Sequence, residues 1–155
     1  MNEIYRPQVH FSAQKGWLND PNGLVYAKGK WHLFFQHCPD KLEWGPMHWG
    51  HAVSADLVHW KELPIALYPD KLGTMFSGSA VIDRLNSSGL GTRRNPPVVA
   101  LYTAAGEPFT QCLAYSLDGG MTLTKLPANP VLKHIIGGNR DPKVVWHEGT
   151  KQWIM

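Results

Sequence analysis

The sequence contains little that would tie it to disulfides, membranes or bound metals. Its 155 residues include two cysteines, Cys38 and Cys112, which are too few for a disulfide framework and lack the spacing of a zinc site. We expect both to be buried free thiols. His48 and His51 also lack partners at metal-ligand spacing, so we expect no metal and no cofactor, and structural roles for these histidines. The longest apolar runs, such as residues 97–101, are too short to span a bilayer.

Charge is also scarce. Charged residues make up 17% of the chain, the formal net charge is +3, and among the basic residues only Arg93 and Arg94 are adjacent. Such scattered basic residues exclude a nucleic-acid-binding surface. The first residues are polar and do not form a signal peptide. The chain does contain seven Trp, and a weakly charged, Trp-rich chain suits a neutral polar ligand with apolar faces, such as a sugar.

No stretch keeps apolar residues at helical spacing for three turns. Short alternating or wholly apolar segments are instead bounded by turn residues, which predicts an all-β fold. Trp31, Trp60, Trp146 and Trp153 fall within these segments and are expected in the core, whereas Trp49 could lie in the core or near a site. The expected strands cover residues 24–26, 31–36, 49–54, 60–63, 76–82, 98–102, 113–116, 123–126, 143–147 and 152–155.

An internal repeat organises these strands. Residues 52–64 and 114–127 share an Ala-x-Ser-x-Asp run followed by Leu-Pro, at an offset of 62 to 63 residues. Four strands in about 60 residues match one blade of a β-propeller. The fold class we predict is therefore the first part of a propeller, with about two and a half antiparallel, four-stranded blades over residues 1–155. Because the last expected strand reaches the last residue, we expect an incomplete ring whose exposed blade edges favour self-association.

Three polar clusters keep the blade spacing, at residues 19–23, 76–79 and 139–142. Each is expected at the start of a blade's first strand, which lines the central channel of a propeller. Asp20 and Asp141 would then face one pocket, with Ser77 between them. The Pro after each Asp should hold that Asp in an extended conformation, and Asn22–Gly23 should form a tight turn. Each cluster taken alone is also explained by ordinary turn residues.

Residues 17–23, Trp-Leu-Asn-Asp-Pro-Asn-Gly, resemble the signature of the β-fructofuranosidases of glycoside hydrolase family 32, which include invertases, levanases and inulinases. The resemblance continues in order through residues 10–11, 34–36, 44–45, 47–51, 76–79 and 140–142. It implies a five-bladed propeller catalytic domain followed by a C-terminal β-sandwich. It also implies hydrolysis of terminal fructose with retention of configuration. Five-bladed families that act on arabinan or xylan are an alternative, but they lack the run at 17–23.

The resemblance also implies roles for individual residues. Asp20 matches the nucleophile, and a carboxylate suits a group that attacks an oxocarbenium-like centre and then leaves. Asp141 matches the residue that binds the fructose hydroxyls and stabilises the transition state. Arg140 could hold the carboxylates and keep them ionised. The remaining matches contact the sugar as hydrogen-bonding partners or aromatic walls: Asn19, Gln36, Ser77, Trp44 and Phe76.

The second carboxyl group of a retaining glycosidase is not evident. In the family it is a Glu normally followed by Cys, and no Glu in this chain precedes a Cys. The glutamates are Glu3, Glu43, Glu62, Glu107 and Glu148. Two interpretations follow. The chain is either the N-terminal part of an enzyme that releases terminal fructose from levan, inulin or sucrose, and inactive by itself, or a truncated, non-catalytic sugar-binding remnant.

The expected partner is a fructose-containing oligo- or polysaccharide. Similarity of residues 44–50 and 76–79 to bacterial exo-fructanases favours a fructan over sucrose. Such enzymes are often exported, which favours a secreted or periplasmic parent protein, and a cytoplasmic location stays open.

Overall fold

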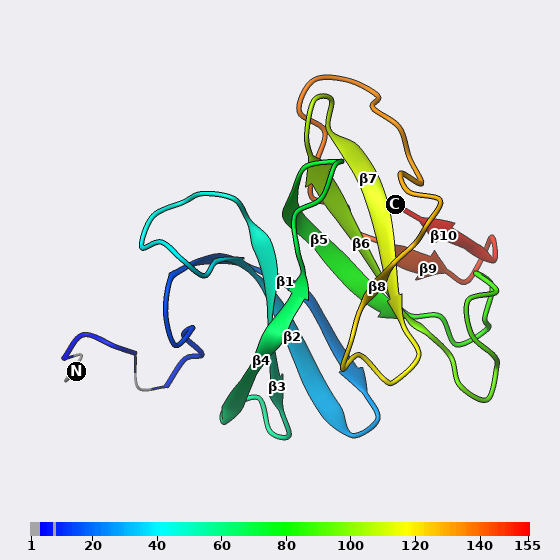
Figure 1. The fold of residues 1–155 in the computed structure, drawn as a ribbon. Helices are drawn as coiled ribbons and strands as arrows, with labels where there is room; N and C mark the ends of the chain where they lie inside the picture. Colours follow the sequence, from blue (N-terminus) through cyan, green and yellow to red (C-terminus); the bar gives the residue numbers. More distant parts are fainter. Residues whose placement is uncertain (1–3, 8) are drawn as a thin grey trace.

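The structure, a computed structural model, describes residues 4–7 and 9–155 and consists of antiparallel β-sheets (Figure 1). Two sheets have four strands each, in the orders β1-β2-β3-β4 and β5-β6-β7-β8, and a third contains β9 and β10. None of the described residues forms a helix, and so none forms a helix able to cross a membrane. The strands are β1 (Trp17–Ala27), β2 (Lys30–Cys38), β3 (His48–Ser54), β4 (Trp60–Leu67), β5 (Thr74–Ile82), β6 (Val98–Ala105), β7 (Thr110–Ser116), β8 (Thr124–Lys125), β9 (Val145–His147) and β10 (Gln152–Ile154).

The predicted all-β fold and propeller architecture are confirmed: each four-stranded sheet is one blade, and every expected strand is present. The bounds differ most for β1, which begins at Trp17 rather than at residue 24. The expected tight turn at Asn22–Gly23 is wrong. Both residues lie inside β1, where the register with β2 shifts between Asn22 and Val25 and Gly23 adopts a φ of 50°. Pairing with β2 outweighs the local turn preference, and the result is an irregularity within the strand.

The two blades pack through their first strands, β1 and β5, which lie side by side (Figure 1). A Cβ atom on Gly23 would lie 3.0 Å from the Ala80 Cβ and 3.2 Å from the Phe34 ring, so the missing side chain permits this close approach. The shared core includes Phe34 and Trp49 from the first blade and Met75 and Tyr102 from the second. The polar clusters on β1 and β5 therefore both lie at the packed interface between the two blades.

The tryptophans divide differently from the prediction. Trp31, Trp60, Trp146 and Trp153 are only partly buried. Trp49 is fully buried, and its indole N–H donates to the Phe76 carbonyl oxygen at 2.9 Å. Trp49 therefore belongs to the core and also ties β3 to β5. Cys38 and Cys112 are buried free thiols, as expected.

Candidate functional site

Asp20 lies on β1, where it faces the neighbouring blade. Its Oδ2 atom accepts a hydrogen bond of 2.7 Å from the Ser77 hydroxyl on β5, 57 residues away. Asp20 is exposed to solvent and Ser77 is buried. The blade spacing thus brings together residues from two of the three polar clusters that the sequence predicted to converge. The hydrogen bond fixes one carboxylate oxygen while the side chain remains accessible to a ligand.

Amide side chains also come from β1 and from its neighbour in the sheet, β2. Asn19 is exposed, and its Oδ1 atom accepts a hydrogen bond of 2.8 Å from the indole N–H of Trp17. Gln36 is buried, and its Nε2 atom donates to the Met75 carbonyl oxygen at 2.8 Å. This hydrogen bond uses one of the two N–H groups of Gln36 and leaves the Oε1 atom and the other N–H for further partners. Asn22, which the sequence analysis treated as a turn residue, is also buried and accepts a hydrogen bond of 3.3 Å from the Gly78 N–H.

Asp141 is not at the start of a strand, because β9 begins four residues later. Its N–H donates to the Thr103 hydroxyl oxygen at 2.9 Å, and its side chain is about half exposed, at 49%. Pro142 was expected to keep Asp141 extended, and this is wrong: Asp141 has a φ of 62°. The left-handed conformation is costly for a non-glycine residue and persists only where surrounding contacts impose it. Asp20 is in an extended strand, as predicted.

The electrostatics around Asp141 also differ from the expectation for Arg140. Burial raises the pKa of Asp141, and the nearby Asp20 carboxylate raises it further. The Arg140 guanidinium, with its Nε atom 3.6 Å from the Asp141 Oδ2 atom, lowers this pKa but does not outweigh burial. Arg140 acts in the expected direction without keeping the pKa of Asp141 at its ordinary value. The influence of Asp20 on Asp141 places both carboxylates in one electrostatic environment.

Phe76, the residue before Ser77, belongs to a group of aromatic side chains. Trp44, in the loop between β2 and β3, is 59% exposed and meets Phe76 with a ring-centroid distance of 6.0 Å. Phe76 in turn meets Phe109 at 5.5 Å. The three rings line a hollow of about 520 Å³, which Glu107 also borders. Phe109 and Glu107 were missed by the sequence analysis, although an aromatic residue in the loop that follows the β6 strand was a usable signal.

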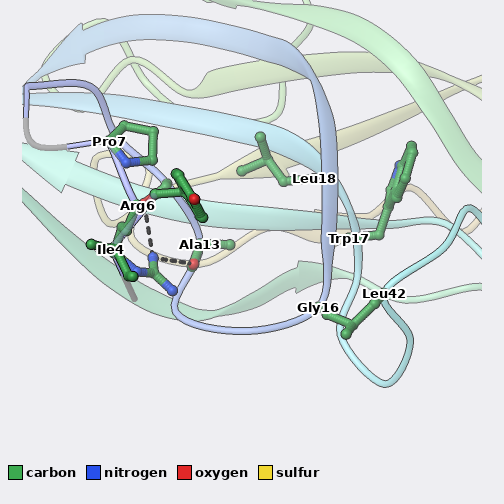
Figure 2. A pocket seen from close by; sticks show the side chains of 10 residues that line it. Ile4, Arg6, Pro7, Ala13, Gly16, Trp17, Leu18 and Leu42 are labelled. Carbon is green, nitrogen blue, oxygen red and sulfur yellow. Dashed lines mark hydrogen bonds between the residues drawn. The ribbon is translucent and has the colours of Figure 1, made fainter. Parts of the chain in front are cut away.

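Another hollow, of about 610 Å³, lies at the N-terminal segment (Figure 2). Arg6 holds this segment through hydrogen bonds of 2.8 Å to the Ser12 hydroxyl and to the Ala13 carbonyl oxygen. The lining, which includes Ile4, Leu18 and Leu42, is mainly apolar and contains no carboxylate. The chemistry therefore concentrates at the interface of β1 and β5. Among the described residues no group of three His, Cys, Asp or Glu side chains could hold a metal ion.

Known proteins match nearly the whole length of this chain. The chain is 54% identical to a levanase of Bacillus subtilis (strain 168) over 99% of its length and 23% of the levanase. It is 46% identical to an invertase of Schizosaccharomyces pombe over 99% of its length and 28% of the invertase. The crystal structure of an exo-inulinase from Aspergillus awamori superposes with a TM-score of 0.87 at 44% identity, over 96% of this chain and 34% of the exo-inulinase.

The chain thus spans about a quarter of the length of these curated relatives. The family model described as the glycosyl hydrolases family 32 N-terminal domain matches residues 10–155. That match covers nearly the whole chain and includes every predicted site residue. The chain therefore belongs to glycoside hydrolase family 32, as part of its N-terminal domain.

Proposed function

We propose that this chain is the nucleophile-bearing part of a retaining glycoside hydrolase that releases terminal fructose from fructans or sucrose. The observation that carries the proposal is the accessible Asp20 carboxylate, oriented by Ser77 beside Asp141 and an aromatic wall. Relatives named levanase, invertase and exo-inulinase support fructose-containing saccharides as the substrate class.

In the proposed reaction an Asp20 oxygen forms a bond to the anomeric carbon of the terminal fructose. The bond from that carbon to the leaving oxygen breaks, and the leaving oxygen takes a proton from a general acid. Water then attacks the same carbon and releases Asp20, so that two inversions give net retention. The hydrogen bond from Ser77 restricts the rotation of the Asp20 carboxylate and so contributes to its orientation for attack.

Asp141 is proposed to accept hydrogen bonds from fructose hydroxyls, most strongly in the transition state. Arg140 would hold its carboxylate and favour the ionised form. Asn19, the oxygen of Gln36 and Ser77 would bind further hydroxyls, while Trp44 and Phe76 would contact the apolar side of the sugar. Such a site combines apolar walls with a few polar groups that fix orientation.

We propose that none of the described glutamates is the proton donor opposite Asp20. Glu62 accepts a hydrogen bond from the Gln14 N–H, and Glu148 pairs with Lys151 in the turn between β9 and β10. Glu43 is exposed, and Glu107 borders the aromatic hollow but is also exposed. General acid–base catalysis contributes about 10²–10⁴-fold, so we propose that these 155 residues alone do not turn over substrate. For this polypeptide in isolation, that favours the second candidate function, a non-catalytic sugar-binding remnant.

Fructose release from sucrose, inulin and levan tests the proposal, with the complete enzyme and the purified 155-residue chain assayed side by side. The complete enzyme should release fructose, and NMR of the fresh product should show the anomeric configuration of the substrate. The chain alone, once circular dichroism shows it folded, should release none. An inverted product, or no fructose from any of the three substrates, would overturn the proposed function.

A further inference from the structure

Residues 139–144 carry Arg140 and Asp141 but contain no strand. They are nevertheless held by buried side chains on three successive strands of the second blade. These are Ser79 on β5, Thr103 on β6 and Gln111 on β7, with exposed fractions of 5%, 0% and 3%. The polar groups of these buried side chains form hydrogen bonds within the protein itself.

The first contacts form one continuous chain of hydrogen bonds. The Asp141 N–H donates to the Thr103 Oγ1 atom at 2.9 Å, and the Thr103 hydroxyl donates to the Gln111 Oε1 atom at 2.6 Å. The Gln111 Nε2 atom donates to the Asn139 carbonyl oxygen at 3.0 Å. This series of hydrogen bonds therefore runs from Asp141 through β6 and β7 and returns to the segment at Asn139.

Ser79 fixes the other side of Asp141. Its hydroxyl donates to the Pro142 carbonyl oxygen at 2.9 Å and accepts a hydrogen bond of 3.1 Å from the Val144 N–H. The backbone of Gln111 also bonds to Leu132 in both directions, at 2.9 and 3.1 Å, which anchors the start of the preceding loop. The hydroxyls of Ser79 and Thr103 and the side-chain amide of Gln111 all have partners here, whereas the buried Oδ1 atom of Asn139 has none. The segment is fixed at both ends.

This arrangement explains the unusual backbone of Asp141. A φ of 62° immediately before a proline is unfavourable for aspartate, and the local sequence would not adopt it unaided. The contacts from Thr103 and Ser79 on either side of the Asp141–Pro142 bond impose it. The direction of the Asp141 carboxylate is thus set by contacts that span up to 65 positions of the sequence.

We propose that Ser79, Thr103 and Gln111 form a polar clamp that positions the Asp141 carboxylate relative to Asp20. They are positioning residues, and their catalytic consequence rests on the proposed function. A displacement of about 1 Å at a catalytic group can cost about 10²-fold in rate. The clamp therefore matters for turnover and not only for the stability of the second blade.

The test compares Thr103→Val, which keeps the shape but removes the hydroxyl, with Thr103→Ser, which keeps the hydroxyl. Both are made in the complete enzyme, beside a stability control, Ser116→Ala. Ser116 lies buried on the same strand as Gln111, but its hydroxyl bonds to Asp118 and Gly120 in the turn after β7. Thr103→Val should lower kcat by roughly 10- to 100-fold with little change in KM. Thr103→Ser should retain kcat within about threefold, and Ser116→Ala should lower Tm with kcat unchanged.

Hydrogen exchange of the Asp141 amide gives a readout independent of activity, because this N–H is the group that Thr103 accepts from. Exchange should accelerate at least about tenfold in Thr103→Val, and remain near the wild-type rate in Ser116→Ala, if the hydroxyl fixes the segment. Unchanged exchange, or a kcat within twofold of wild type in Thr103→Val, would overturn the clamp. If wild-type enzyme releases no fructose, the proposed function fails while the exchange result still decides whether the clamp exists.

Discussion

The two complete blades have the same outer turns but different inner strands. In the first blade Ser54 donates to Asp56 at 3.1 Å after β3, and in the second Ser116 donates to Asp118 at 2.6 Å after β7. At the inner strands the equivalent clusters differ, because β1 presents Asp20 and β5 presents Ser77. The repeated residues build the scaffold, and the residues that depart from the repeat build the site.

The faces that the blades turn toward the following sheet differ as well. The first blade buries His32 and His51 there, and Gly120, in the turn after β7 of the second blade, packs against His32. In the second blade the positions at the repeat offset are Val99 and Leu113, which line an apolar hollow of about 350 Å³ together with Trp153. One blade therefore has a titratable interface where the other has an apolar one, and pH should affect them differently.

The largest expected effect is on kcat, and it should differ between the two inner strands, β1 and β5. In the complete enzyme Asp20→Ala removes the proposed nucleophile and should lower kcat by roughly 10⁴-fold or more, with a much smaller change in KM. Ser77→Ala removes one hydrogen bond to a charged group and should lower kcat about tenfold. Steady-state kinetics on sucrose and inulin measure both. Equal losses in the two variants would contradict the division of roles between β1 and β5.

Arg140→Gln tests the electrostatics at the third cluster. Arg140 lowers the pKa of Asp141 against the effects of burial and Asp20, so its removal should raise that pKa further. If the ionised carboxylate is the active form, activity is lost as pH falls through this pKa. The acidic limb of kcat/KM should then move to higher pH in Arg140→Gln, and the loss of activity should be greatest at the acidic end of the profile. A uniform loss at every pH would show that Arg140 acts only in binding.

Features that repeat or alternate along the chain could be predicted from the sequence. Alternating apolar segments located the strands, and the offset between the Ser54 and Ser116 turns located the blades. The same spacing predicted that Asp20 and Ser77 converge. These predictions succeeded because a blade is one local unit, whose pattern specifies its pairing.

Features set by contacts between distant segments could not be predicted in this way. The φ of Asp141 depends on Thr103 and Ser79. Local sequence preferences do not predict a left-handed conformation for an aspartate that precedes a proline. The local turn preference of Asn22–Gly23 was overridden by pairing with β2. The contact of Phe109 with Phe76 depends on the path of the loop between β6 and β7.

The histidine pair of the first blade should make stability depend on pH. The His51 Nε2 and His32 Nδ1 atoms lie 3.0 Å apart. Burial, together with the neighbouring His32, lowers the pKa of His51 to about 3, from 6.5 in the unfolded chain. Below pH 6.5 the unfolded chain takes up a proton that the folded chain does not, so stability falls as pH drops from about 6.5 toward 3.

The double variant His32→Val/His51→Leu copies the residues of the second blade at both positions. It should flatten the slope of Tm against pH between pH 4 and 6.5, and thermal unfolding at several pH values measures this. Ser116→Ala serves as a control that lowers Tm without removing the slope. An unchanged slope in the double variant would mean that other groups cause the acid sensitivity.

The smallest expected effect compares the two outer turns, through Asp118→Ala and Asp56→Ala. Burial disfavours the Asp118 carboxylate, but hydrogen bonds from Ser116 and Thr122 outweigh burial and lower its pKa to about 2. Asp118→Ala should therefore cost about 1 kcal/mol at pH 7, which corresponds to about 3 °C in Tm for a chain of this size. Because the folded pKa lies below the unfolded value of 3.8, this stabilisation is present above about pH 4 and is lost as pH falls toward 2. The Asp56 side chain is 50% exposed and its carboxylate is screened by solvent, so Asp56→Ala should lower Tm less than Asp118→Ala does. Thermal unfolding at pH 7 and pH 3 measures both variants, and a larger loss for Asp56→Ala would show that the two turns, although alike in sequence, contribute differently from what their burial indicates.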